Sequence, residues 1–221
     1  MSLVSSINEI GQRMVACNYH CAGIALDTHK GILPRCLILE IEGRKGSKGS
    51  VVVGINPGRS RPDEREFYRS NGQTYEQVMA YWQERVGYLH RYYTKLRTLV
   101  GQLGFEGPIL WTELVKCENT SSKSGQPPLQ TFRTCTRTYL STELQVVPDE
   151  WPLIAIGTES FKALAYMFAS RAVIGIPHPT GSHGQFSSLF DSKKQLLPKV
   201  KALTKAIVNQ EGRKAVWLRS K

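Results

Sequence analysis

Short apolar runs alternate with longer amphipathic stretches along this 221-residue chain. The runs that we expect to form buried strands are 36–43, 50–55, 107–117, 151–157 and 172–179. Helical spacing of apolar residues is found at 3–16, 74–103, 129–147, 158–169 and from 193 onward. Strands alternating with helices predict an α/β fold with a mainly parallel central sheet flanked by helices. No repeat or clear linker interrupts the pattern, so we expect a single domain over residues 1–221, including an N-terminal helix and a basic C-terminal helix.

Two predictions concern the segments between these elements. The runs 36–43 and 50–55 are joined by the Gly-, Ser- and Lys-rich stretch RKGSKGS, which favours a β-hairpin. Residues 59–73 and 118–128 are polar and rich in turn-forming side chains, so we expect loops there.

Polar, turn-forming residues follow several of the expected strands. GINPG (54–58, the first motif) ends one apolar run, and HPTG (178–181, the second motif) ends another. Glu113 lies near the end of the run 107–117. Ligands of parallel sheets bind beyond the carboxyl ends of the strands, so we expect these residues to converge on one edge of the sheet.

The charge of the chain narrows the choice of partner. There are 29 Lys and Arg residues against 18 Asp and Glu, a formal net charge of +11. Such a surplus favours a polyanionic partner, nucleic acid before an acidic membrane, although a basic protein without such a partner is the alternative. No secretion signal or apolar run of membrane-spanning length is present. Together with five cysteines, an odd number, this leads us to expect a reducing compartment, either cytoplasmic (nucleoid-associated) or nuclear.

The two motifs, in this order, resemble the active-site motifs of the uracil-DNA glycosylase superfamily. GINPG resembles the first motif of the mismatch-specific and single-strand-selective branches, and HPTG resembles the family's His-Pro-Ser. Between them, ILWTELVKC and LIAIGTESFKALA resemble segments of the iron–sulfur branch (family 4). The resemblance covers about residues 14–190.

The resemblance implies a monofunctional DNA glycosylase that flips out a deaminated base, uracil or a related lesion, and hydrolyses its N-glycosidic bond in base excision repair. Asn56 would orient the attacking water, because an amide is not a strong base. His178 would donate to the base O2 as negative charge develops there. The base would lie against Gly54, Ile55, Glu113 and either Phe67 or Tyr68. The alternative for the motifs is structural: a β-turn at Asn56 and a histidine at a strand end.

Glu113 departs from the family pattern, which has an asparagine that reads the uracil edge. An ionised carboxylate only accepts hydrogen bonds, so it would face the uracil O4 unfavourably. A protonated Glu113 would suit uracil or cytosine, and burial would favour this neutral form. We therefore expect either a base preference that differs from plain uracil or weak activity.

A basic surface would neutralise DNA phosphates, and binding would weaken as salt rises. The family also inserts side chains from the stretch after its second motif into the gap left by the flipped nucleotide. The residues that we expect to contact DNA are Gly58, Arg59, Arg61, Lys116, Lys123, Thr180, Ser182, His183, Gln185 and Phe186, with the Lys- and Arg-rich C-terminus. We expect DNA as the partner, a monomeric chain and no obligate protein partner.

The iron–sulfur branch holds a [4Fe–4S] cluster with four cysteines. Its ligand order is matched here by Cys17, Cys21, Cys117 and Cys135, although the first spacing is Cys-x3-Cys rather than Cys-x2-Cys. Four thiolates are what such a cluster needs. Zinc would suit the same four thiolates, and unligated thiols are the third alternative. Cys36 remains outside the set and is expected to act as a small buried hydrophobe.

Two other functions compete with the glycosylase. The first is a catalytically weak or inactive DNA-binding module of the same fold, which Glu113 favours and an intact pair of Asn56 and His178 disfavours. The second is a hydrolase of small-molecule nucleotides or nucleosides, which the positive charge disfavours. The motifs place no lysine as a Schiff-base nucleophile, so strand cleavage is not expected.

Overall fold

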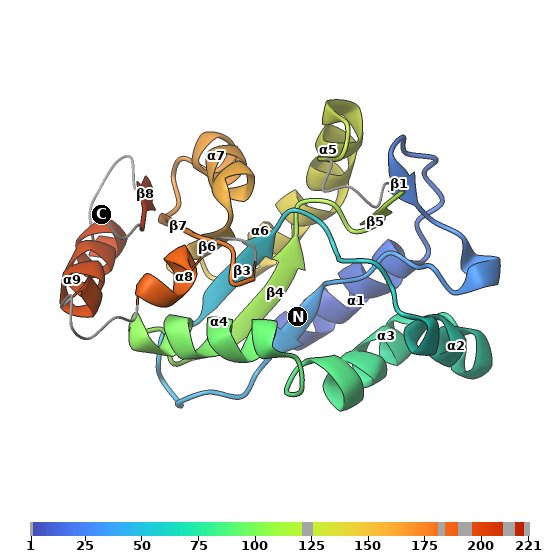
Figure 1. The fold of residues 1–221 in the computed structure, drawn as a ribbon, viewed down its shortest axis with the longest axis horizontal. Coiled ribbons are helices and arrows are strands. Elements are labelled where there is room, and N and C mark those ends of the chain that lie inside the picture. The colour runs from blue at the N-terminus through green and yellow to red at the C-terminus, as the bar shows by residue number, and fades with distance from the viewer. Residues whose placement is uncertain (1, 121–125, 181–183, 190–195, 210–214, 219–221) are drawn as a thin grey trace. The chain divides into compact units, whose positions relative to one another are not determined.

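The computed structural model describes residues 2–120, 126–180, 184–189, 196–209 and 215–218. Its main feature is a mostly parallel six-stranded sheet in the order β2-β4-β3-β6-β7-β8, and β1 pairs separately with β5 (Figure 1). The strands are β1 Ile24–Ala25, β2 Ile38–Glu40, β3 Ser50–Gly54, β4 Ile109–Glu113, β5 Glu118–Asn119, β6 Leu153–Ile156, β7 Val173–Ile176 and β8 Ala215–Trp217. The expected α/β fold with a mainly parallel sheet is confirmed.

Helices occupy most of the segments in which helical spacing was found. They are α1 Leu3–Val15, α2 Pro62–Asn71, α3 Tyr75–Tyr81, α4 Arg91–Gln102, α5 Leu129–Cys135, α6 Ser141–Val146, α7 Thr158–Met167, α8 Gln185–Ser188 and α9 Leu196–Asn209. A π-helical turn, Trp82–Val86, continues α3, and another, Thr136–Leu140, joins α5 to α6. Within the described ranges, none of the helices combines the length and the apolar character that crossing a bilayer requires.

The chain divides into two compact units. The first unit comprises residues 1–39, 55–89 and 111–148, and the second comprises residues 40–54, 90–110 and 149–221. In the first unit, α1 packs against α3 and α6, and α2 packs against α3 (Figure 1). In the second unit, α7 packs against β6 and β7, and α9 contacts β8 (Figure 1).

The centre of the sheet is apolar on both faces. Val52 of β3 is paired with Ile154 of β6, which in turn is paired with Ile174 of β7, and both pairings are parallel. Every residue of these three strands is buried, as is typical of parallel strands covered on both sides. Because the three strands run in the same direction, their carboxyl ends at Gly54, Ile156 and Ile176 lie at one edge of the sheet.

The predicted β-hairpin is wrong. In the sheet order, β4 lies between β2 and β3, so the two runs on either side of RKGSKGS are not neighbours. The start of β3 and the residues before it pair instead with the segment before β4. Ser50 N–H donates to the Pro108 carbonyl (3.0 Å) and Gly107 N–H donates to the Lys48 carbonyl (3.1 Å). A Gly-rich turn permits a hairpin but does not determine which strands pair. Here the buried strand β4 occupies the position between β2 and β3.

The predicted loop at 59–73 is also wrong, because α2 spans Pro62–Asn71. Pro62 opens the helix, Asp63 and Glu64 lie in its first turn, and the Arg61 N–H donates to the Glu64 carboxylate (3.3 Å). Proline and acidic residues at these positions favour a helix start. The polar composition of the segment concealed this signal.

Two helical predictions are confirmed only in part. The stretch 74–103 is not one helix, since the chain leaves helical geometry at Tyr88–His90 before α4 begins. The segment from 193 onward contains α9, but it also contains β8, which joins the sheet beside β7 in parallel. The three residues of β8 are too few to produce a recognisable strand pattern.

We expect the core of the sheet to dominate the stability of the fold. Ile154 is fully buried between two paired strands, and Ile154→Ala should lower the free energy of unfolding by about 2–5 kcal/mol. Leu203 on α9 is 42% exposed, so Leu203→Ala should cost less than about 1 kcal/mol. Urea denaturation of both variants measures the difference. Equal losses would contradict this description of the core.

Candidate functional site

The first motif forms the loop that follows β3, and Asn56 lies at its centre. The Asn56 side chain is half-buried, and its Nδ2 donates to the Pro57 carbonyl (3.0 Å), which orients the carboxamide. The Ile55 carbonyl accepts from the Val115 N–H (2.8 Å), so the loop is tied to the chain just after β4. Asn56 is therefore held at a defined position within the first unit.

A buried arginine and two carboxylates fix the remainder of this loop. Arg35 is 7% exposed and its Nε lies 3.0 Å from the Glu64 carboxylate. Its Nη2 lies 2.9 Å from the carboxylate of Glu118, which is 3% exposed. The same guanidinium donates to the Gly58 carbonyl. One buried cation thus joins two carboxylates and the backbone of the first motif.

Glu118 holds the loop at Ser60, two residues after the contact made by Arg35. Its Oε2 accepts from the Ser60 N–H (2.5 Å), while Arg65 donates to the Ser60 hydroxyl (2.7 Å) and to Glu118 Oε1 (3.3 Å). Burial alone would raise the pKa of Glu118, but the hydrogen bond from Ser60 and the charge of Arg35 lower it below its ordinary value. Glu118 is consequently ionised at neutral pH. We refer to Arg35, Glu64, Glu118 and Arg65 as the loop-holding network.

Sequence reasoning did not identify this network. Its signals were weak but present: an arginine inside the apolar segment ILPRCLILE, and a glutamate directly after Lys116-Cys117 at the end of an apolar run. Charged residues in such positions are buried only when they are paired.

The two aromatic candidates for base stacking differ in exposure. Tyr68 is 2% exposed and its hydroxyl donates to Glu64 (3.4 Å), so its selection as a stacking residue is wrong. Phe67 is half-buried, and its ring lies against those of Tyr68 (5.9 Å) and Tyr81 (5.3 Å). Both come from α2 rather than from a loop, because the segment after the first motif is helical.

Glu113 ends β4 and has an unusual environment. Its Oε2 is buried and has no hydrogen-bond partner, while its main-chain carbonyl accepts from Lys116 Nζ (2.7 Å). Burial raises the pKa of Glu113 to about 8, although the positive charges of Lys116 and Arg35 oppose the shift. The side chain is therefore mostly a neutral acid near pH 7, which is a hydrogen-bond donor as well as an acceptor.

The assignment of Lys116 to a DNA phosphate is wrong. Lys116 is fully buried, and its Nζ lies 2.8 Å from Glu143 Oε1 and 2.9 Å from Glu143 Oε2. The same Nζ donates to the Thr112 hydroxyl. The sequence prediction placed this basic residue on the surface, but its charge is paired with Glu143 inside the first unit.

The second motif lies in the second unit, directly after β7. His178 Nδ1 accepts from the Thr180 N–H (3.2 Å), so the proton of the neutral ring resides on Nε2. The His178 side chain is exposed, and partial desolvation of its ring lowers its pKa, which favours this neutral form. The His178 ring lies 5.5 Å from that of Tyr92 on α4, and Lys95 of the same helix donates to the Pro179 carbonyl (3.4 Å). The ring thus presents an Nε2–H donor.

The other residues expected to touch DNA fall into three groups. Gly58, Arg59, Arg61, Thr180 and Gln185 are exposed. Phe186 is 2% exposed, so its selection as an inserted side chain is wrong. Lys123, Ser182 and His183 lie outside the described residues. Arg59 donates to the Thr120 carbonyl (3.1 Å) and Arg61 donates to the Tyr81 hydroxyl (3.0 Å), and both contacts lie within the first unit.

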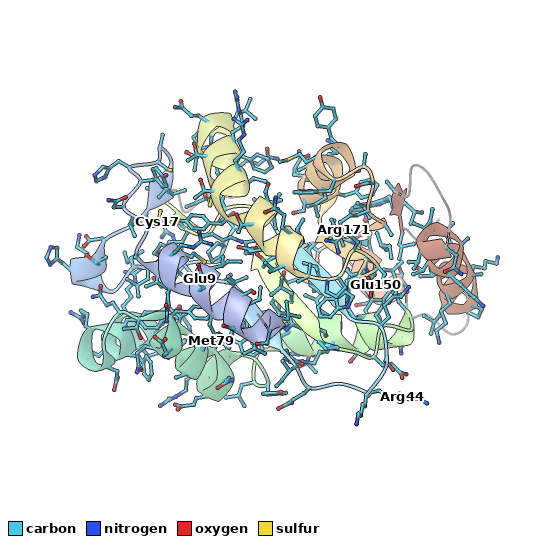
Figure 2. All side chains as sticks on the ribbon, turned by 180° about the vertical axis from the view of Figure 1, so that it is seen from behind. Glu9, Cys17, Arg44, Met79, Glu150 and Arg171 are labelled. Atoms are coloured by element: carbon cyan, nitrogen blue, oxygen red, sulfur yellow. The ribbon has the colours of Figure 1, made fainter. Side chains whose placement is uncertain are left out.

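A strand pairing and a side-chain hydrogen bond bring together segments that carry the selected cysteines. The short strand β1 follows Cys21, and it pairs with β5, which follows Cys117. The Thr131 hydroxyl on α5 donates to the Ala22 carbonyl (2.7 Å), which draws the helix bearing Cys135 to the same place. Figure 2 shows Cys17 just beyond the end of α1.

All four selected cysteines line one cavity of about 20 Å³ in the first unit: Cys17, Cys21, Cys117 and Cys135. Cys36 is not among its lining residues. Burial raises the pKa of Cys117 to about 12 and that of Cys135 to about 11, and neighbouring thiols add to both shifts. Their number and type fit a thiolate-ligated metal group. Among the described residues, however, no three His, Cys, Asp or Glu side chains are close enough together to form a metal-binding group.

Comparison of the chain with profiles of known protein families, and with curated protein sequences, returned no match.

The environment of Glu113 predicts a pH dependence of stability. The folded protein retains this proton up to about pH 8, whereas the unfolded chain releases it near pH 4.5, so stability should fall as the pH rises through this window. Glu113→Gln should remove the fall and make the protein more stable than the wild type above pH 8, by on the order of 5 kcal/mol. Below pH 4.5 the two proteins should converge. Denaturation curves between pH 4 and 9 test this, and parallel curves would contradict it.

Proposed function

We propose that this protein is a monofunctional DNA glycosylase that flips out a deaminated base, uracil or a related lesion, and hydrolyses its N-glycosidic bond. The observation that carries the proposal is the fixed first motif, in which buried charges hold the loop at Gly58 and Ser60 and Asn56 is oriented by its hydrogen bond to Pro57. Groups held in place before the substrate arrives are what rapid chemistry requires. Each motif follows the carboxyl end of a parallel strand, which is the position at which ligands of such sheets bind.

In this mechanism the bond between the sugar C1′ and the base nitrogen breaks first, and its electron pair leaves with the base. Asn56 orients a water molecule that adds to C1′. This water loses a proton to solvent, and the departing base anion takes one from solvent. The neutral His178 donates its Nε2–H to the base O2, where negative charge develops. The products are a free base and an abasic site, and no covalent enzyme intermediate forms.

Glu113 contributes the selection of the base. As a neutral acid it donates its hydroxyl to one acceptor and accepts from one adjacent donor. Uracil presents O4 and N3–H in this arrangement, and cytosine presents N3 and the N4 amino group. Phe67 supplies an aromatic surface for stacking.

The positive charge of the chain supports DNA as the substrate. Arg59 and Arg61 are exposed beside the first motif, and the chain carries a net charge of +11. These residues would bind phosphates without reading sequence.

A second proposal concerns the cysteine cavity, whose four thiols would hold a [4Fe–4S] cluster. Bound there, the cluster would act as a cross-link between segments that are distant in sequence. Cys17 and Cys21 lie between α1 and β1, Cys117 precedes β5 and Cys135 ends α5. Holding the cluster would require the four thiols to lie closer together than they do in this structure, in which no three of these four described cysteines form a metal-binding group.

The competing function is a DNA-binding module without activity. Glu113 favours it, since a carboxyl group with an unpaired oxygen replaces the family's amide. An assay of the reaction separates the two functions.

The glycosylase proposal predicts base release from end-labelled oligonucleotides that carry one uracil, hypoxanthine, xanthine or thymine. The substrates are presented single-stranded and opposite each base, with alkali to reveal abasic sites. Asn56→Ala should lower the rate by about 10²-fold or more, because the water is no longer oriented, while DNA binding is retained. Absence of product on every substrate, with salt-sensitive binding intact, would establish the binding module instead.

The cluster proposal predicts about four iron atoms and matching sulfide per chain after anaerobic purification, together with a brown colour. Cys117→Ser should lose the iron. Cys36→Ala is the matched control and should retain it, since Cys36 does not line the cavity. If the wild-type protein contains zinc instead of iron, the cavity is a zinc site. If it contains no metal, the proposal of a metal site is wrong.

A further inference from the structure

We infer that Arg35 and Glu118 are positioning residues, whose buried ion pair holds the loop between β3 and α2 in the conformation that presents Asn56. This inference rests on the proposed function, because it assigns the residues that prepare the first motif for reaction. It adds to that function two residues that lie outside both motifs and far apart in the sequence.

The contacts at the two residues all lead to the same loop. Arg35 donates to the Gly58 carbonyl, and Glu118 accepts from the Ser60 N–H (2.5 Å). The ion pair between them, at 2.9 Å, therefore connects two backbone groups that lie two and four residues after Asn56. Arg65, from the first turns of α2, completes the arrangement by binding both Ser60 and Glu118.

The hydrogen bonds of Ile55 and Asn56 hold the start of the loop, whereas the backbone of Gly58 and Ser60 is held by the ion pair. Gly58 is exposed and has open space where a side chain would lie, so sterics place little restriction on its backbone. Pro57 restricts only its own φ angle and that of its neighbour. The polar groups of residues 58 and 60 are the places where outside side chains can restrain the loop.

Because the ion pair is buried, the loss of either charge is expected to disturb the loop strongly. Arg35 and Glu118 are 7% and 3% exposed, and a buried charge without its partner is strongly unfavourable. Removal of either charge leaves the other unpaired next to the loop. The network should then rearrange, and the Gly58 carbonyl and Ser60 N–H should lose their fixed partners.

The test uses Glu118→Gln, which keeps the size and the acceptor oxygen but removes the charge. We expect the single-turnover rate of base release to fall by about 10- to 100-fold while the DNA dissociation constant changes by less than about threefold. We also expect faster hydrogen exchange at the Ser60 amide in the DNA-free protein. Arg35→Lys should act in the same direction, because an ammonium cannot reproduce the planar fork of a guanidinium.

Glu40→Gln is the matched control. Glu40 is 8% exposed and pairs with Arg97 (2.7 Å and 2.8 Å), so the variant also removes one charge from a buried carboxylate–arginine pair, but it touches neither motif. It should lower the melting temperature to a similar extent and leave both the rate and the exchange of Ser60 unchanged.

The inference is overturned if Glu118→Gln leaves the exchange of Ser60 unchanged, or if exchange accelerates without loss of rate. A parallel loss of rate in Glu40→Gln would also overturn it, because the effect would then follow stability alone. If the wild type releases no base from any substrate, the proposed function fails. In that case the exchange result by itself decides whether Arg35 and Glu118 hold the loop.

Discussion

The salt bridge between Arg35 and Glu118 is the interaction on which the first motif depends. Two charges with almost no exposure to water are stable only if every polar atom around them has a partner. Those partners include the backbone of the loop after β3. The hydrogen bonds that satisfy the ion pair therefore also fix the conformation of the loop. Glu118 is also the residue after Cys117, so one short segment of chain contributes both to the cysteine cavity and to the loop-holding network.

Much of the fold could be predicted because strands buried on both faces have a strong sequence signature. The apolar runs at β3, β6 and β7 identify these strands without knowledge of the strands they pair with. Once the strands were predicted, the polar motifs could be placed at the ends of β3 and β7. The hairpin failed because strand pairing is non-local, whereas the turn that suggested it is local. The helix α2 was missed because it buries few apolar side chains and is stabilised by its capping residues and ion pairs.

The site could be predicted only as far as residue types allow. Asn56 and His178 follow strands as expected, but Lys116 and Tyr68 are buried, which no property of their motifs reveals. The partners of Lys116 lie on β4 and α6, so its burial is set by tertiary packing. The network around Arg35 escaped notice for the same reason, since its charges come from segments that are distant in sequence.

The central claim is that a fixed Asn56 directs water onto the sugar carbon of a flipped nucleotide. The most direct measurement is mass spectrometry of the products formed from a DNA strand that carries a single deaminated base. The account predicts equal amounts of free base and of a strand lighter by the base and heavier by one water, with no protein–DNA adduct trapped by borohydride. Unaltered DNA from every such strand, or a trapped adduct, would contradict it.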